Sequence, residues 1–181
     1  DADVLDKATI LLTPTATSNA RVHSVKTYTG DELVTNGNFS TSGTPDASSH
    51  TLGWYSNTDG VEIANGKLTL TNDASGDARA YATDGVSSNN ILTTNNVYKL
   101  TFDITDNTNC TNFNIYQNAG SFVSVTNTVG SYTYYITNTS NRLFIFRNNT
   151  VNSSISLDNV SLVDVSSDFD FDRASSATRI N

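Results

Sequence analysis

Apolar and polar residues alternate in short runs along much of the chain, and the clearest example spans residues 61 to 70. A period of two residues is the pattern of a strand with one buried face. Two such runs meet at Asn65-Gly66, a pair that tolerates positive φ and suits a type I′ turn. Residues 61 to 70 therefore predict a β-hairpin.

Further runs of this kind are separated by polar turn clusters, without a helical period between them, which favours a sandwich of antiparallel sheets. Composition agrees. Asn, Ser and Thr make up about two residues in five, whereas Glu occurs only at positions 32 and 62, so extensive helix is not expected. The remaining strands are predicted at Ala78 to Thr83, Val97 to Asp103, Asn112 to Gln117, Phe122 to Asn127, Tyr132 to Thr137, Arg142 to Arg147 and Ser154 to Val163.

Two of these segments indicate how the core is built. In the segment from Val97, the alternate residues that should face the core are Tyr98, Leu100, Phe102 and Ile104. Around position 145, by contrast, four consecutive residues are apolar, so both faces of that strand carry apolar side chains. This pattern suits either a central strand or a strand covered by a neighbouring subunit. The four residues are Leu143, Phe144, Ile145 and Phe146.

Two segments at the ends of this region form a matched pair, residues 33–40 and residues 154–162. The second alternates Ile155 and Leu157 with polar residues, and then Val160 and Leu162 after a slip of one residue. Together with Gly53-Trp54, the pair resembles the carbohydrate-binding-module-like jelly roll over residues 32 to 165. The resemblance implies a two-sheet sandwich in which the first and last strands lie together.

The flanks of this module carry a second resemblance. Residues 6–14 with 23–26, and the run Asp168-Phe169-Asp170-Phe171 with its continuation to Asn181, are similar to segments of structural proteins of tailed bacteriophages, including fibre-type proteins. We therefore expect an N-terminal docking arm at 1–31, the jelly roll at 32–165 and a C-terminal docking segment at 166–181. Pro14 favours an extended arm with one strand.

Charge, cysteine content and hydropathy limit the partners of the chain. The formal net charge of -8 and a sequence pI near 4.4 argue against a nucleic-acid-binding surface. Cys110 is the single cysteine, so an internal disulfide is excluded, and we expect it to be a buried small residue. Membrane insertion is not expected, because no apolar run approaches the length of a span. Met is absent even at position 1, which indicates a piece of a longer or processed polypeptide.

Catalytic chemistry has little support in the sequence, so we do not expect an enzyme. Most Asp residues lie in turn contexts such as Asp59-Gly60, Asp73, Asp77 and Asp84-Gly85, where the carboxylate caps its own backbone. The two His residues are isolated, and no Gly-x-Ser-x-Gly motif surrounds a Ser. We expect no cofactor. The jelly-roll resemblance implies a possible structural calcium near the first and last strands, with Asp158 and Asn38 as its candidate ligands.

Sugar binding uses an exposed aromatic ring bordered by hydrogen-bonding groups. The aromatic candidates are Trp54, Tyr55, Tyr81, Tyr116 and the run Tyr132-Thr133-Tyr134-Tyr135. We select Tyr132, Tyr134, Tyr116 and Trp54 as glycan-contacting residues. Packing in the core or at a subunit interface is the alternative for each, and for Trp54 the resemblance favours the core.

Two functions follow as hypotheses. The first is a non-enzymatic bacteriophage virion protein, a tail or head fibre or adaptor subunit at the particle surface. It would contact other virion proteins, form a homo-oligomer, with a trimer favoured, and bind host surface polysaccharide through the jelly roll. The second is an ancillary carbohydrate-binding domain of a secreted bacterial polysaccharide-degrading enzyme, which leaves the flanks unexplained.

Overall fold

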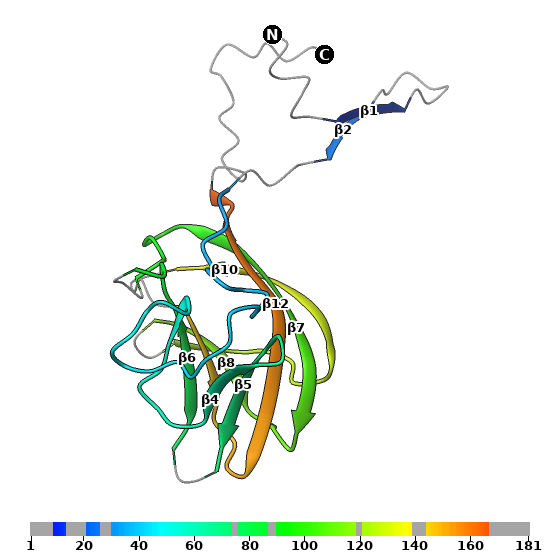
Figure 1. Cartoon of the computed structure of the whole chain (residues 1–181). Coiled ribbons are helices and arrows are strands. Elements are labelled where there is room, and N and C mark those ends of the chain that lie inside the picture. The colour runs from blue at the N-terminus through cyan, green and yellow to red at the C-terminus, as the bar shows by residue number, and fades with distance from the viewer. Residues whose placement is uncertain are drawn as a thin grey trace.

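The computed structural model describes residues 9–13, 21–25, 30–73, 76–86, 90–118, 121–138 and 144–166. All the regular elements in these ranges are β-strands. Ten strands form two five-stranded sheets, and every strand pair within them is antiparallel. The predicted all-β, two-sheet sandwich is therefore confirmed (Figure 1).

We call one sheet the β7 sheet, after one of its two longest strands, and the other the β11 sheet, after its central strand. The β7 sheet has the order β10 (Gly130–Thr137), β7 (Val97–Thr108), β12 (Ser153–Asp164), β5 (Lys67–Asn72) and β4 (Val61–Ala64). The β11 sheet has the order β3 (Trp54–Tyr55), β6 (Ala78–Ala82), β11 (Ile145–Asn148), β8 (Phe113–Asn118) and β9 (Ser121–Ser124).

The hairpin predicted at residues 61 to 70 is present as β4 and β5. Ala64 pairs with Lys67 across a two-residue turn, and Asn65 and Gly66 have φ values of 54° and 72°. Positive φ at both turn residues is the type I′ geometry, whose twist matches that of the flanking strands.

The first and last segments of the sandwich lie together, as the jelly-roll resemblance implies. Glu32 pairs with Val163 in an antiparallel bridge, and the backbone N–H of Leu33 donates to the carbonyl of Leu162 at 3.0 Å. The first segment is a bridge followed by a turn rather than a strand, because Asn36 and Phe39 adopt positive φ. The chain therefore enters and leaves the sandwich at one end (Figure 1).

The slip in the sequence pattern of β12 corresponds to a β-bulge. The register of β12 against β7 shifts between Asp158 and Ser161, where Asn159 has a φ of 50°. The extra residue restores the inward direction of the apolar positions that follow. As a result, Ile155, Leu157, Val160 and Leu162 are all buried.

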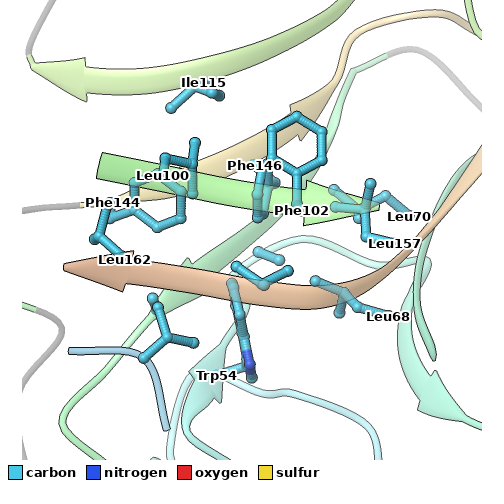
Figure 2. Close-up of a cluster of buried hydrophobic side chains, with 14 of the residues drawn as sticks. Trp54, Leu68, Leu70, Leu100, Phe102, Ile115, Phe144, Phe146, Leu157 and Leu162 are labelled. Carbon is cyan, nitrogen blue, oxygen red and sulfur yellow. The ribbon is translucent and has the colours of Figure 1, made fainter. Parts of the chain in front are cut away.

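The core lies between the sheets and is rich in aromatic rings (Figure 2). Phe146 of β11 is at its centre, with ring centroids 5.3 Å from Phe102, 5.6 Å from Phe113 and 6.1 Å from Trp54. The four residues predicted to face inward from β7 are all buried. Edge-to-face and stacked ring pairs of this kind add about 0.5 to 1.5 kcal/mol each beyond the area that they bury.

The apolar residues around position 145 belong to a central strand. β11 is the middle strand of its sheet, Phe144 and Phe146 are in the core, and Ile145 is only 2% exposed in the single chain. No second subunit is needed to cover Ile145. The alternative explanation, cover by a neighbouring copy, is therefore unnecessary, and Leu143 lies outside the described residues.

The N-terminal arm contains two strands, not the single one expected. β1 (Thr9–Thr13) and β2 (Arg21–Val25) pair as an antiparallel hairpin, and neither joins a five-stranded sheet. The rest of the arm, except Gly30 and Asp31, and the C-terminal run 168–181 lie outside the described residues. Their docking role stays a prediction.

Candidate functional site

The outer face of the β11 sheet carries a row of large side chains. Ala80, Ala82 and Phe146 point into the core, so Tyr81 and Ile145, which alternate with them, lie on the opposite face. The backbone register aligns Tyr55 with Tyr81, and Tyr81 with Ile145. The same register aligns Ile145 with position 116 on β8, and position 116 with position 122 on β9. One line of residues thus crosses all five strands, and we call it the aromatic row.

Tyr55 forms the half-exposed end of this row. Its ring packs edge-on against Tyr81 with centroids 5.1 Å apart, and His50 stacks on it at 5.7 Å. Tyr81 and Ile145 are buried beneath the surface. Within the described residues, Nδ1 of His50 is one of two buried side-chain polar atoms without a hydrogen-bond partner. Of the two tyrosines Tyr55 and Tyr81, Tyr55 is the more exposed, so its ring is the better placed to stack on a ligand.

A second, polar row runs beside the aromatic row on the same face. Arg79 pairs with Arg147, and Arg147 with Asn114, which in turn pairs with Ser124. The Nδ2 of Asn114 donates to Asn112 at 2.7 Å, and the hydroxyl of Ser124 donates to Asn114 at 3.2 Å. Amide, hydroxyl and guanidinium groups therefore border the aromatic row.

Asp77 joins the two arginines of the polar row. Its Oδ2 accepts hydrogen bonds from Nη2 of Arg79 at 2.8 Å and from Nε of Arg147. Nη2 of Arg147 also donates to Asn149 at 2.9 Å. The Asp77 side chain is 8% exposed and that of Arg79 is 39% exposed. The sequence placed Asp77 in a turn role. That expectation is wrong, because its carboxylate binds two strands together.

Electrostatics reinforce this cluster. Burial alone would raise the pKa of Asp77, but the hydrogen bonds and charges of Arg79 and Arg147 outweigh burial and hold this pKa below its ordinary value. The hydrogen bond to Asp77 is the main cause of a raised pKa at Arg79, and a hydrogen bond with Tyr81 adds to it. Asp77 and Arg79 are therefore both charged at neutral pH.

A hollow of about 440 Å³ adjoins the Asp77 end of the polar row. Its walls include Thr58 and Asn72 together with the carboxylates of Asp59, Asp73 and Asp77. The hollow is open, and these Asp, Asn and Thr residues offer acceptors for the hydroxyl groups of a ligand that extends beyond the row.

Trp54 lies in the core, which is the alternative that the sequence left open for it. Its side chain is 0% exposed, and its Nε1 donates to the carbonyl of Asn36 at 3.3 Å. A fully buried ring presents no face to a ligand. The selection of Trp54 as a glycan contact is therefore corrected.

Tyr132 and Tyr134 also pack against the core, at the edge strand β10. Their rings lie 5.8 Å and 5.9 Å from that of Phe102. The hydroxyl of Tyr132 donates to the carbonyl of Thr128 at 2.8 Å, and that of Tyr134 accepts from the N–H of Thr126 at 3.2 Å. Both rings face inward, so the structure supports the packing alternative for these two residues.

Tyr116 is the selected residue that falls on the aromatic row. Its backbone pairs with Ile145 on one side and with Phe122 on the other. Its side chain is outside the part of the structure that is described. Its contact with a glycan stays a prediction, and its place in the register is consistent with that role.

Sequence reasoning missed the polar row and set Tyr55 and Tyr81 aside. The signal was present in β6, which reads Ala78-Arg79-Ala80-Tyr81-Ala82. Alanine at every second position leaves room in the core for the rings of the facing sheet, whereas arginine and tyrosine occupy the other face. The alternation of small and large residues could have identified this outer face.

The candidate calcium ligands are engaged in local turns. Oδ1 of Asp158 accepts from the N–H of Asn159 at 2.7 Å, and Oδ1 of Asn38 accepts from the N–H of Ser40 at 3.2 Å. Among the described residues, no three His, Cys, Asp or Glu side chains are grouped as metal ligands. Calcium binding stays a prediction.

The described residues include no helix of the length and apolarity that a membrane span requires.

Three solved structures of carbohydrate-binding modules resemble this chain. A CBM4 module has a TM-score of 0.46 and 13% identity, covering 72% of this chain and 99% of that one. A family 16 module has a TM-score of 0.43 and 15% identity, and the match covers 72% of this chain and 99% of that one. A family 29 module has a TM-score of 0.39 and 10% identity, and the match covers 68% of this chain and 90% of that one. Such similarity is too low to transfer a ligand. No protein-family model and no curated protein matches the chain.

Proposed function

We propose that this chain is a non-enzymatic carbohydrate-binding protein whose ligand lies on the outer face of the β11 sheet. The observation that carries the proposal is the alignment of the aromatic row, with half-exposed Tyr55 at one end, beside the polar row. The C–H face of a sugar stacks on a tyrosine ring, and its hydroxyl groups need the amide, hydroxyl and carboxylate partners that the polar row and the adjoining hollow supply.

A glycan array probed with the full 181-residue chain tests this proposal. We expect binding to at least one oligosaccharide and a loss of about five- to thirtyfold in affinity for Tyr55→Ala, which corresponds to roughly 1 to 2 kcal/mol. Tyr135→Ala is the matched control, because Tyr135 is 51% exposed on the other sheet. If the array shows no binding, or if both variants lose affinity equally, this face is not the ligand site.

A second, finer proposal concerns where the protein acts. The phage-like flanks at 6–26 and 168–181 support a structural subunit of a bacteriophage particle, a homo-oligomer with a trimer favoured, whose copies multiply weak sugar contacts by avidity. This proposal rests on the sequence of the flanks. The alternative, an ancillary module of a secreted polysaccharide-degrading enzyme, uses the same ligand face. Antibody labelling of purified particles in electron micrographs distinguishes them, because a particle without label contradicts the virion proposal.

A further inference from the structure

We infer that the glycan bound by the outer face of the β11 sheet carries a carboxylate group, as a uronic acid does, and that Arg79 and Arg147 recognise it. This inference rests on the proposed function and specifies its ligand. It depends on where the described cations of the sandwich lie.

Two of the four cationic side chains that the structure describes lie side by side on this face. The chain has a formal net charge of -8, and the cations whose side chains are described are Lys67, Arg79, Lys99 and Arg147. Arg79 and Arg147 are direct partners in the register of β6 and β11. Lys67 and Lys99 lie apart from them, on β5 and β7 of the other sheet. Half of these cations are therefore adjacent on the proposed ligand face.

Asp77 is a single carboxylate placed between two guanidinium groups. It accepts hydrogen bonds from both arginines, so the cluster of three side chains keeps one net positive charge. A guanidinium has five N–H donors, and the 39% exposure of Arg79 leaves part of its side chain facing solvent. The carboxylate of Asp77 fixes both arginines in place before a ligand arrives, which lowers the entropy cost of binding.

The geometry of the guanidinium group favours a carboxylate over a neutral hydroxyl. The planar fork of arginine matches the two oxygens of a carboxylate, and such charged hydrogen bonds are about twice as strong as neutral ones. Tyr81 follows Arg79 by two residues on the same face of β6 and so joins the polar row to the aromatic row. A sugar ring on the aromatic row thus places a substituent near the arginines.

The other charges of the module orient the ligand without preventing its binding. Asp59 and Asp73 border the adjoining hollow, so repulsion directs an acidic group toward the arginines and away from the hollow. Salt at physiological concentration screens the repulsion between a polyanion and exposed charges more than about 8 Å away. Contact with partly buried Arg147, whose side chain is 17% exposed, is screened less.

The test is an array of matched oligosaccharide pairs, each with an acidic member and its carboxyl-reduced or methyl-esterified counterpart. Galacturonan, glucuronan and alginate oligomers provide the acidic members. For the full chain we expect the acidic member of the bound pair to bind at least about tenfold more tightly, which is roughly 1.4 kcal/mol. Arg79→Gln should abolish this preference, whereas Lys67→Gln, the matched loss of one charge on the other sheet, should retain it.

Each other outcome has a definite meaning. Equal or tighter binding of the neutral members overturns the carboxylate inference and leaves the proposed function intact. Binding to no glycan, acidic or neutral, overturns the proposed function and the inference with it. If Arg79→Gln fails to fold, the salt dependence of the unmodified chain decides. Affinity for the acidic member must fall as NaCl rises from about 0.05 M to about 0.5 M, and an unchanged affinity overturns the inference.

Discussion

Asp77 is the residue on which the polar row depends, because one of its oxygens accepts hydrogen bonds from two neighbouring strands. Asp84, by comparison, accepts a hydrogen bond from the N–H of Val86 in its own loop at 2.9 Å. Asp77 instead holds Arg79 and Arg147, so we expect its removal to lower stability and to weaken binding at the proposed ligand face.

Asp77→Asn should lower the free energy of unfolding by about 1 to 3 kcal/mol at pH 7, because two guanidinium groups lose a charged acceptor. The pKa of Asp77 is lowered in the folded state, below its ordinary value of 3.8. The stabilisation is therefore complete above that value and is lost as the pH falls through the lower, folded pKa. Urea unfolding at pH 7 and pH 3 measures this. An equal difference between variant and parent at both pH values would contradict the assignment.

Gly53 illustrates a second residue-scale constraint. It has a φ of 74°, and a Cβ added there would lie 2.3 Å from the carbonyl oxygen of Thr35. Gly66 has nearly the same φ of 72°, but a Cβ there meets nothing within 4 Å. Both Gly→Ala variants incur the cost of positive φ, about 1 kcal/mol, and only the first adds a backbone clash.

Thermal unfolding of the two glycine variants separates these costs. Gly53→Ala should be less stable than Gly66→Ala by at least about 1 to 3 kcal/mol, since backbone must shift beside the buried Trp54. Equal melting temperatures for the two variants would show that the Thr35 contact is unimportant.

At the scale of elements, Glu32 attaches the first segment of the sandwich to β12. Its Oε1 accepts from the N–H of Val34 at 2.9 Å and from the N–H of Leu162 at 2.8 Å. The contact spans nearly the whole module in sequence. It replaces the regular strand ladder that the positive-φ turn at Asn36 interrupts.

Glu32→Ala should lower the free energy of unfolding by about 1 kcal/mol, a modest value because Glu32 is exposed. The amide of Leu162 should exchange hydrogen faster in the variant, because it loses its acceptor. Glu62→Ala is the control, since Glu62 is exposed on β4 and is the other glutamate of the chain. Unchanged exchange at Leu162 would show that Glu32 does not attach this segment.

The elements that follow local rules could be predicted from the sequence. The Asn65-Gly66 hairpin needs only turn chemistry and alternation, and the slip in β12 predicted which apolar residues are buried. The proposed ligand face could not be predicted as readily, because it depends on the register that brings Tyr55, Tyr81 and Ile145 together from three strands. The alternating sequence around Tyr132 and Tyr134 fits either a binding surface or an inward-facing strand. Only their ring contacts with Phe102 show that they pack inward.

At the scale of the whole molecule, Cys110 reports on global unfolding. Burial raises the pKa of its thiol, and its Sγ donates to Asn148 at 3.3 Å inside the core. The neutral, covered thiol is unreactive in the folded state. An aromatic disulfide reagent should therefore label the native chain at pH 8 at least about a hundredfold more slowly than the chain in guanidinium chloride. Similar rates under the two conditions would contradict this burial.

The pairing of Glu32 with Val163 determines how the sandwich responds to mechanical force. Because residues 31 and 164 leave the sandwich at the same end of an antiparallel pair, a pull that separates the two flanks unzips its hydrogen bonds one after another. Under the proposed function, a ligand held on the β11 sheet would pull against both flanks together and would not open this pair first. Tension from a bound surface would then be carried through β12 and the first segment in parallel.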